Sequence, residues 1–108
     1  MKLKFKKDSF RNARGSYSRM LSLHCRKCNN LICAYQKDGN GSLLRLYFDR
    51  IMAPKELTGL QHIPITNIKH LNCKYCGKPI GNPYIYPIEK RKAFRLYQNA
   101  VTKKIVKS

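Results

Sequence analysis

The sequence predicts a small, mainly β domain with antiparallel strands, and three observations support this fold class. Two Cys-x-x-Cys pairs stand far apart in a chain of 108 residues. Short runs of β-branched, aromatic and aliphatic residues alternate with turns rich in Gly, Asn and Pro, which is typical of strands joined by loops. Lysine and arginine gather at both ends of the chain. This length fits one domain, which we place at residues 20–108, preceded by a basic arm at residues 1–19.

Each cysteine pair is followed by a residue that tolerates a positive φ angle, Asn29 after the first pair and Gly77 after the second. Such a residue allows a tight turn whose backbone N–H groups point at the sulfur atoms. Two pairs supply four thiolates, a closed tetrahedral set that is typical of a structural zinc ion. The predicted zinc ligands are Cys25, Cys28, Cys73 and Cys76.

The segment between the two pairs, from Asn29 to Asn72, has 44 residues. This exceeds the ~15–20 residues of small four-cysteine sites, so we expect it to contain several strands that bring the pairs together. Structural disulfides are the alternative, but five cysteines are an odd number and no secretory signal precedes them. We expect His24 beside the site or on the surface and Cys33 in a buried run; either residue is an alternative ligand.

The composition is strongly basic, with 23 lysines and arginines against 5 acidic residues and a formal net charge of +18. Charge repulsion at this level opposes a compact state unless a polyanion neutralises it. Nucleic acid is the commonest such partner, and an anionic membrane surface is the next. No apolar run approaches the ~20 residues of a transmembrane helix, and the basic N-terminus lacks the apolar segment of a secretory signal. We therefore expect a cytoplasmic protein.

Gly, Ser and several lysines in residues 1–19 discourage regular structure, so we expect this arm to be disordered when free and ordered on an anionic partner. Residues 90–108 form a second basic region, which contains no acid. Both regions are expected to contact the phosphates of RNA. The candidate RNA-binding residues are Lys2, Lys4, Lys6, Lys7, Arg11, Arg14, Arg19, Arg91, Lys92, Arg95, Lys103 and Lys104.

The segment after the first cysteine pair predicts a β hairpin. Residues 31–36 are largely apolar and indicate a buried strand. An Asp-Gly and an Asn-Gly pair follow within residues 37–42, which is a strong hairpin signal. Residues 43–51 then alternate as a returning strand. Its expected buried face holds Leu44, Leu46 and Phe48, and its outer face Arg45, Tyr47 and Asp49. A face that combines aromatic and cationic groups can stack bases and contact phosphates.

Two less regular segments follow. Residues 53–59 predict a connector with one helical turn. Residues 61–71 predict an edge strand, in which Pro64 takes a position that needs no backbone donor. A short strand is expected at residues 84–88, just after the second cysteine pair.

The C-terminal part allows two interpretations. Residues 93–97 and 101–106 have the composition of strands and predict a basic hairpin around residues 98–100. A helix over residues 89–100 is the competing interpretation, because Phe94, Tyr97 and Val101 also fall at helical spacing.

The two Cys-x-x-Cys turns, each followed by Asn or Gly, resemble the knuckles of zinc ribbons. The long spacing also resembles the small β-tent zinc folds, in which two knuckles pin two antiparallel sheets. This resemblance extends from Cys25 to Ile80, and it implies a structural zinc held by the four paired cysteines. It implies no function, because such folds host many. In size and basic ends the chain is similar to small ribosomal proteins that combine a zinc ribbon with basic tails.

The leading hypothesis is a zinc-stabilised RNA-binding protein, most plausibly ribosome-associated, that joins a larger assembly as a monomer and contacts rRNA. The alternative is a zinc-stabilised β module that binds a protein or a small ligand. We do not expect an enzyme. A redox enzyme needs a reactive thiolate free of metal, and Cys33, the single cysteine outside the pairs, stands in an apolar run.

Overall fold

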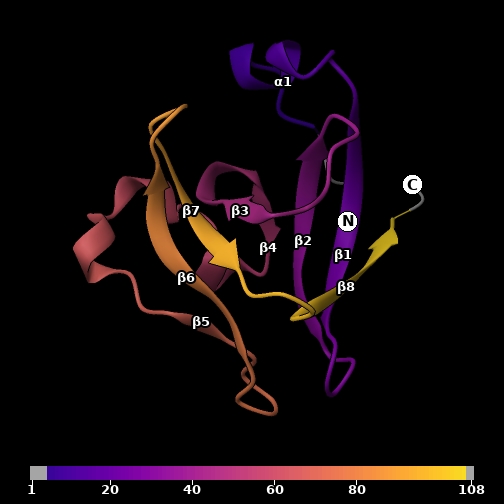
Figure 1. The fold of residues 1–108 in the computed structure, drawn as a ribbon, viewed down its shortest axis with the longest axis vertical. Coiled ribbons are helices and arrows are strands. Elements are labelled where there is room, and N and C mark those ends of the chain that lie inside the picture. Colours follow the sequence, from indigo (N-terminus) through magenta and orange to yellow (C-terminus); the bar gives the residue numbers. More distant parts are fainter. Residues whose placement is uncertain (1–4, 107–108) are drawn as a thin grey trace.

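The computed structural model describes residues 5–106. Two antiparallel four-stranded sheets form the framework of this part, which confirms the expected mainly β fold (Figure 1). The first sheet contains, in spatial order, β4 (Ile51–Ala53), β2 (Leu31–Asp38), β1 (Ser18–Cys25) and β8 (Val101–Ile105). The second sheet contains β3 (Arg45–Tyr47), β7 (Arg91–Leu96), β6 (Pro79–Tyr86) and β5 (Leu71–Asn72).

The helices in residues 5–106 are short and lie in the connections. They are α1 (Ser9–Ala13) and the 3₁₀ helices η1 (Phe48–Arg50), η2 (Lys55–Leu57), η3 (Leu60–His62) and η4 (Ile65–Asn67). The helical turn expected after residue 53 corresponds to η2. None of the helices in the described part has the length and apolar character needed to cross a membrane.

The core joins the two sheets and follows the alternation of side chains along β1 and β2. Leu21 and Leu23 of β1 lie opposite Tyr35 and Cys33 of β2, and all four side chains are buried. They belong to one apolar cluster with Phe94 of the second sheet. Burial of an aliphatic or aromatic side chain of this size contributes roughly 1.5–3 kcal/mol. Figure 1 shows the two cysteine turns, between β1 and β2 and between β5 and β6, at the same end of this core.

The predicted hairpin of residues 31–51 is wrong, because its second strand belongs to the other sheet. β3 pairs with β7, with Leu46 opposite Phe94, whereas β2 pairs with β1 and β4. The predicted alternation also fails, since Leu46, Tyr47 and Phe48 are all buried. Phe48 packs on Phe94 with 4.6 Å between ring centroids. This aromatic contact places the short strand against β7 rather than against β2.

The edge strand predicted at residues 61–71 is also wrong, because this segment contains η3 and η4 and becomes a strand only at Leu71. Leu57, Leu60, Ile65 and Ile68 pack against the core. Ile65 and Ile68 are three positions apart along η4, which suits the three-residue turn of a 3₁₀ helix and not the two-residue period of a strand.

The strand interpretation of the C-terminal region is correct, since β7 covers Arg91–Leu96. The predicted basic hairpin is wrong, because β8 does not pair with β7. It pairs with β1 in the first sheet, with Val101 opposite Cys25. The crossing contains Asn99, which has a positive φ of 60°, and the buried Ala100. The C-terminal strand therefore ties the two sheets together.

The N-terminal arm expected at residues 1–19 lies against the first sheet over its described part, which begins at residue 5. The backbone of Lys6 donates to Gln36 Oε1 at 2.6 Å, and Gln36 Nε2 donates to the Lys6 carbonyl at 2.8 Å. Asp8 caps the N-terminus of α1 by accepting from the backbone N–H of Arg11 at 3.1 Å. β1 already begins at Ser18. These contacts pack residues 6–18 on the first sheet, and the disorder of the arm in the absence of a partner stays a prediction.

Candidate functional site

The two cysteine turns share one backbone geometry. The amide of Asn29 donates to the Cys25 carbonyl at 2.8 Å, and the amide of Cys25 donates to the Asn30 carbonyl at 2.9 Å. In the second turn the amide of Gly77 donates to the Cys73 carbonyl, and the amide of Cys73 donates to the Lys78 carbonyl, both at 2.8 Å. Asn29 has φ 65° and Gly77 has φ 78°, so both adopt the left-handed conformation that the turn requires. The first turn joins β1 to β2 in the first sheet, and the second turn joins β5 to β6 in the second sheet.

The four paired cysteines form a compact cluster in which a metal ion can be bound. Their sulfur atoms all lie within 4.8 Å of one another. Cys25 Sγ is 3.6 Å from Cys76 Sγ, and Cys28 Sγ is 3.5 Å from Cys73 Sγ. A tetrahedral ion with metal–sulfur bonds of ~2.3 Å separates its ligands by about 3.8 Å. The cluster fits one such ion, which would link the two sheets because both short contacts run between the turns.

The thiols of the cluster differ in acidity. The backbone N–H and the side-chain amide of Asn30 lower the pKa of Cys28 to about 6, and the amide nitrogen lies 3.3 Å from its sulfur. The backbone N–H of Lys78 also lowers the pKa of Cys76, but burial and the neighbouring sulfurs outweigh it and raise that pKa to about 11. Thiolates crowd against one another here, and a bound cation would neutralise them.

His24 and Cys33 lie outside the sulfur cluster. His24 is partly exposed and places Nδ1 3.2 Å from the Asn29 carbonyl oxygen and Nε2 3.2 Å from Ser22 Oγ. Cys33 is fully buried, and burial raises its pKa to about 12. His24 is therefore a neighbour of the cluster, and Cys33 is a core thiol.

No family model, curated protein or solved structure matches this chain significantly. The cysteine cluster and the charged surface are the features from which a function can be inferred.

Buried arginines hold three of the acidic side chains. Arg50 is 1% exposed and donates to Asp8 at 2.6 Å and to Asp38 at 3.0 Å. Hydrogen bonding to Arg50 holds the pKa of Asp8 below its usual value. Arg91 is 5% exposed and donates to Asp49 at 2.7 Å. This network fastens the N-terminal segment to β2 and to the start of β7.

The remaining two carboxylates also have cationic partners. Arg14 donates two hydrogen bonds to Glu89, at 2.6 and 2.9 Å, and these lower the pKa of Glu89. Lys74 lies 3.7 Å from Glu56 on the surface. Within residues 5–106 four cations thus pair with all five carboxylate side chains, and the other lysines and arginines of this part have no carboxylate partner.

The predicted RNA contacts fall into three groups. Lys2 and Lys4 lie outside the described residues. Four others make internal contacts: Lys6 with the Asp49 carbonyl, Arg14 and Arg91 with the carboxylates above, and Lys92 with the carbonyls of Gln61 and Ile63. Arg91 is buried and paired with Asp49, whereas Lys6, Arg14 and Lys92 stay partly or fully exposed. The third group has no carboxylate partner and is exposed or half-exposed. It comprises Lys7, Arg11, Arg19, Arg95, Lys103 and Lys104.

Sequence reasoning missed a set of arginine–tyrosine pairs on the second sheet. The guanidinium of Arg95 lies 4.6 Å from the ring centre of Tyr84, and that of Arg45 lies 4.1 Å from the ring centre of Tyr86. Arg45 Nε also donates to the Tyr84 hydroxyl at 2.8 Å. The spacing of Tyr84 and Tyr86, two positions apart on β6, was the only sign of this face in the sequence. Their arginine partners come from two other strands, so the pairs could not be recognised from the sequence.

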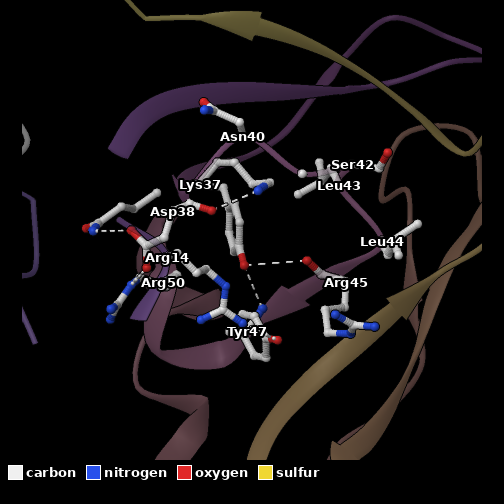
Figure 2. Close-up of a pocket in the computed structure, with 14 residues that line it drawn as sticks. Arg14, Lys37, Asp38, Asn40, Ser42, Leu43, Leu44, Arg45, Tyr47 and Arg50 are labelled. Atoms are coloured by element: carbon white, nitrogen blue, oxygen red, sulfur yellow. Dashed lines mark hydrogen bonds and ion pairs between the residues drawn. The ribbon is translucent and has the colours of Figure 1, made fainter. Parts of the chain in front are cut away.

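A cavity of about 420 Å³ lies beside β3 (Figure 2). Its lining includes Lys37 at the end of β2, the following loop to Leu44, and Arg45 and Tyr47 of β3. The hydroxyl of Tyr35 accepts from the Tyr47 backbone at 2.9 Å at the base of this region. Burial, and then the charge of nearby arginines, lowers the pKa of Lys37. The lining carries four cationic side chains, those of Arg14, Lys37, Arg45 and Arg50, against the single carboxylate of Asp38, so the cavity has an excess of positive charge.

Proposed function

We propose that this chain is a zinc-stabilised RNA-binding protein. The observation that carries the proposal is the complete pairing of its carboxylates inside residues 5–106, which leaves most of the cations of that part without an acidic partner. A formal charge of +18 is therefore left for an external polyanion to neutralise. RNA supplies phosphates at close spacing, and neutralising them releases counterions.

Zinc is the proposed occupant of the cysteine cluster. The support is a set of four sulfur donors without an oxygen or nitrogen ligand, at separations that suit a tetrahedral ion. A closed set of thiolates leaves no position for substrate, so the role is structural. Iron also accepts four thiolates, and elemental analysis of the purified protein distinguishes the two metals.

The proposal is for binding and not for catalysis. Cys33 is the single cysteine outside the cluster, and its burial and raised pKa keep it in the unreactive thiol form. Association with ribosomes, through rRNA, is the form of RNA binding that we favour, because small basic proteins of this kind are neutralised inside large RNA assemblies. Co-sedimentation with ribosomes that high salt reverses would support it.

The test of RNA binding is its salt dependence. If six to ten phosphates are neutralised, affinity falls ~10³–10⁵-fold between about 50 and 200 mM salt. Lys103→Gln with Lys104→Gln removes two exposed charges of β8, and the slope of log affinity against log salt should flatten by about 1–2 units. Lys103→Arg with Lys104→Arg is the matched control and should keep the slope. If the protein shows no salt-sensitive RNA binding but binds anionic vesicles, its proposed partner is a membrane surface and not RNA.

A second candidate function is a module that binds a small anionic ligand, and the cavity beside β3 favours it. Its volume of about 420 Å³ lies within the range of small-molecule sites. Lys37 is its least satisfied cation, since Nζ donates only to the backbone carbonyl of Asp38 at 2.8 Å among the described residues. Inorganic phosphate or a nucleoside monophosphate should then raise the melting temperature of the protein and not that of Lys37→Met. An equal response of both proteins would exclude this site.

A further inference from the structure

One face of the second sheet carries two arginine and two tyrosine side chains that lie against one another. We call it the Tyr–Arg face, and its members are Arg45, Tyr84, Tyr86 and Arg95. The strand register places these residues on the same side. Arg45 lies opposite Arg95 across β3 and β7, and Tyr84 lies opposite Ala93 across β6 and β7. Tyr86 follows Tyr84 by two positions and so points the same way.

Each arginine of the Tyr–Arg face lies on a tyrosine ring. The distances from guanidinium carbon to ring centre are 4.1 Å for Arg45 over Tyr86 and 4.6 Å for Arg95 over Tyr84. Arg45 reaches from β3 across β7 to β6, and the small side chain of Ala93 lies on the same side of the strand between them. The bond from Arg45 Nε to the Tyr84 hydroxyl, at 2.8 Å, fixes this position. The guanidinium of Arg45 is therefore held in place before any partner arrives.

The other side of the sheet is covered by the chain itself. Lys92 points to that side and donates to the carbonyls of Gln61 and Ile63, and Phe94 faces Leu57 and Leu60. The N-terminal segment covers one end of the Tyr–Arg side, where Phe10 lies against the guanidinium of Arg91. What stays open is the Tyr–Arg face, with Arg95 exposed and its other three members half-exposed.

The charge of the Tyr–Arg face is not neutralised. The carboxylates of residues 5–106 are paired with Arg14, Arg50, Arg91 and Lys74, and none with Arg45 or Arg95. A guanidinium supported by a ring from below offers a flat cationic surface above and donors at its edge. Nucleic-acid bases stack on surfaces of this kind, and phosphates accept from the edge.

We propose that the Tyr–Arg face binds unpaired RNA, with bases stacked on the guanidinium planes of Arg45 and Arg95 and phosphates at their edges. This inference rests on the proposed function and names the class of RNA. Tyr84 and Tyr86 are two positions apart on a strand, which separates the two stacks by about 6.7 Å. Successive bases in a helix are ~3.4 Å apart, so bases that use both stacks must be splayed. A single strand or a loop allows this, whereas a duplex does not.

The experiment compares a single-stranded oligouridine with a fully paired RNA duplex that has the same number of phosphates, at one salt concentration. The wild-type protein should bind the oligouridine more tightly. Arg45→Lys with Arg95→Lys keeps both charges and removes both planes, so affinity for oligouridine should fall about tenfold per stack lost. Affinity for the duplex and the salt slope should stay unchanged, because both depend on charge.

The matched control is Arg26→Lys, the same change at an exposed arginine that lies outside the second sheet and is not one of the candidate RNA contacts, and it should leave both affinities unchanged. Tyr84→Phe keeps the ring under Arg95 but loses the hydroxyl that accepts from Arg45, so it should bind oligouridine more tightly than Tyr84→Leu, which loses both. Unchanged metal content and melting temperature show that each variant is folded.

The outcomes separate the two proposals. If the wild type binds oligouridine and the Arg45→Lys, Arg95→Lys variant binds it equally well, the Tyr–Arg face is not the site. Tighter wild-type binding to the duplex contradicts the preference for unpaired RNA. If the wild type binds neither RNA, the proposed function itself fails, and this inference with it.

Discussion

Asn29 and Gly77 occupy the same position in the two cysteine turns. Both have positive φ, and both donate a backbone hydrogen bond to the carbonyl of the first cysteine. A left-handed residue with a Cβ costs roughly 1–2 kcal/mol, and asparagine reduces this cost by local hydrogen bonding. Open space surrounds the Cβ position of Gly77, so backbone conformation alone decides which residues fit there.

Gly77 therefore allows a test at a single residue. Gly77→Asn, which copies the first turn, should lower the free energy of unfolding by less than about 0.5 kcal/mol, whereas Gly77→Val should lower it by about 1–2 kcal/mol or more. Denaturant unfolding in the presence of metal measures both. Equal costs for the two variants would show that the turn does not depend on the left-handed conformation.

At the scale of elements, an ion-pair network links pieces of chain that the strands do not join. Arg50 in η1 connects Asp38 at the end of β2 with Asp8 at the start of α1. The guanidinium is almost fully buried, so the two carboxylates take the place of water. Breaking a buried pair by removing one partner typically costs 3–5 kcal/mol, because the other charge stays buried and unpaired.

Arg50→Met should therefore lower the free energy of unfolding by about 3–5 kcal/mol. It should also increase proteolysis near residue 8, since α1 loses its anchor. Lys74→Met is the matched control, because the pair of Lys74 and Glu56 is exposed on both sides, and its cost should stay below about 1 kcal/mol. A similar small cost for Arg50→Met would show that the network contributes little.

The sequence predicted where the strands of this chain lie better than it predicted which strands pair with one another. The cysteine turns could be found because their ligands are local pairs, and the strands predicted at residues 31–36 and 93–97 follow from composition and correspond to β2 and β7. Strand pairing could not be found in this way, because a contact between Phe48 and Phe94 draws β3 to the second sheet. Burial of Arg50 was equally hidden, since its acidic partners are spread along the chain.

At the scale of the whole molecule, stability is expected to depend on the metal. The cluster joins the β1–β2 turn of one sheet to the β5–β6 turn of the other. Apparent binding free energies of structural zinc reach ~10–16 kcal/mol, which exceeds the stability of a typical small domain. Removal of the ion should therefore unfold the chain as a unit.

A strong chelator should abolish the β circular dichroism spectrum, and added zinc should restore it. Cys76→Ser should behave like the chelated protein, and Cys33→Ser, a change at a buried cysteine outside the cluster, should still bind one ion. A folded protein that elemental analysis shows to be free of metal would contradict this dependence.

Acid should also destabilise the whole molecule. The folded state lowers the pKa values of Asp8 and Glu89 from their ordinary values of 3.8 and 4.5, so it binds fewer protons than the unfolded state. The stability that these groups contribute is complete above the ordinary values and is lost as pH falls through the lower, folded-state values. An Arg14→Met, Glu89→Met double variant should lose less stability than the wild type between about pH 5 and pH 3. Parallel losses in the two proteins would rule out the Glu89 pair as a source of acid sensitivity.

The pairing of β8 with β1 has a consequence for the order of events during translation. The strand nearest the N-terminus gains its edge partner only when Val101–Ile105 has left the exit tunnel. Cys25 and Cys28 emerge well before Cys73 and Cys76, so the growing chain first presents half of its sulfur donors and an unsatisfied strand edge. Topologies with such distant partners form slowly and are exposed to aggregation while incomplete. The first sheet can thus be completed only after Val101–Ile105 has left the tunnel.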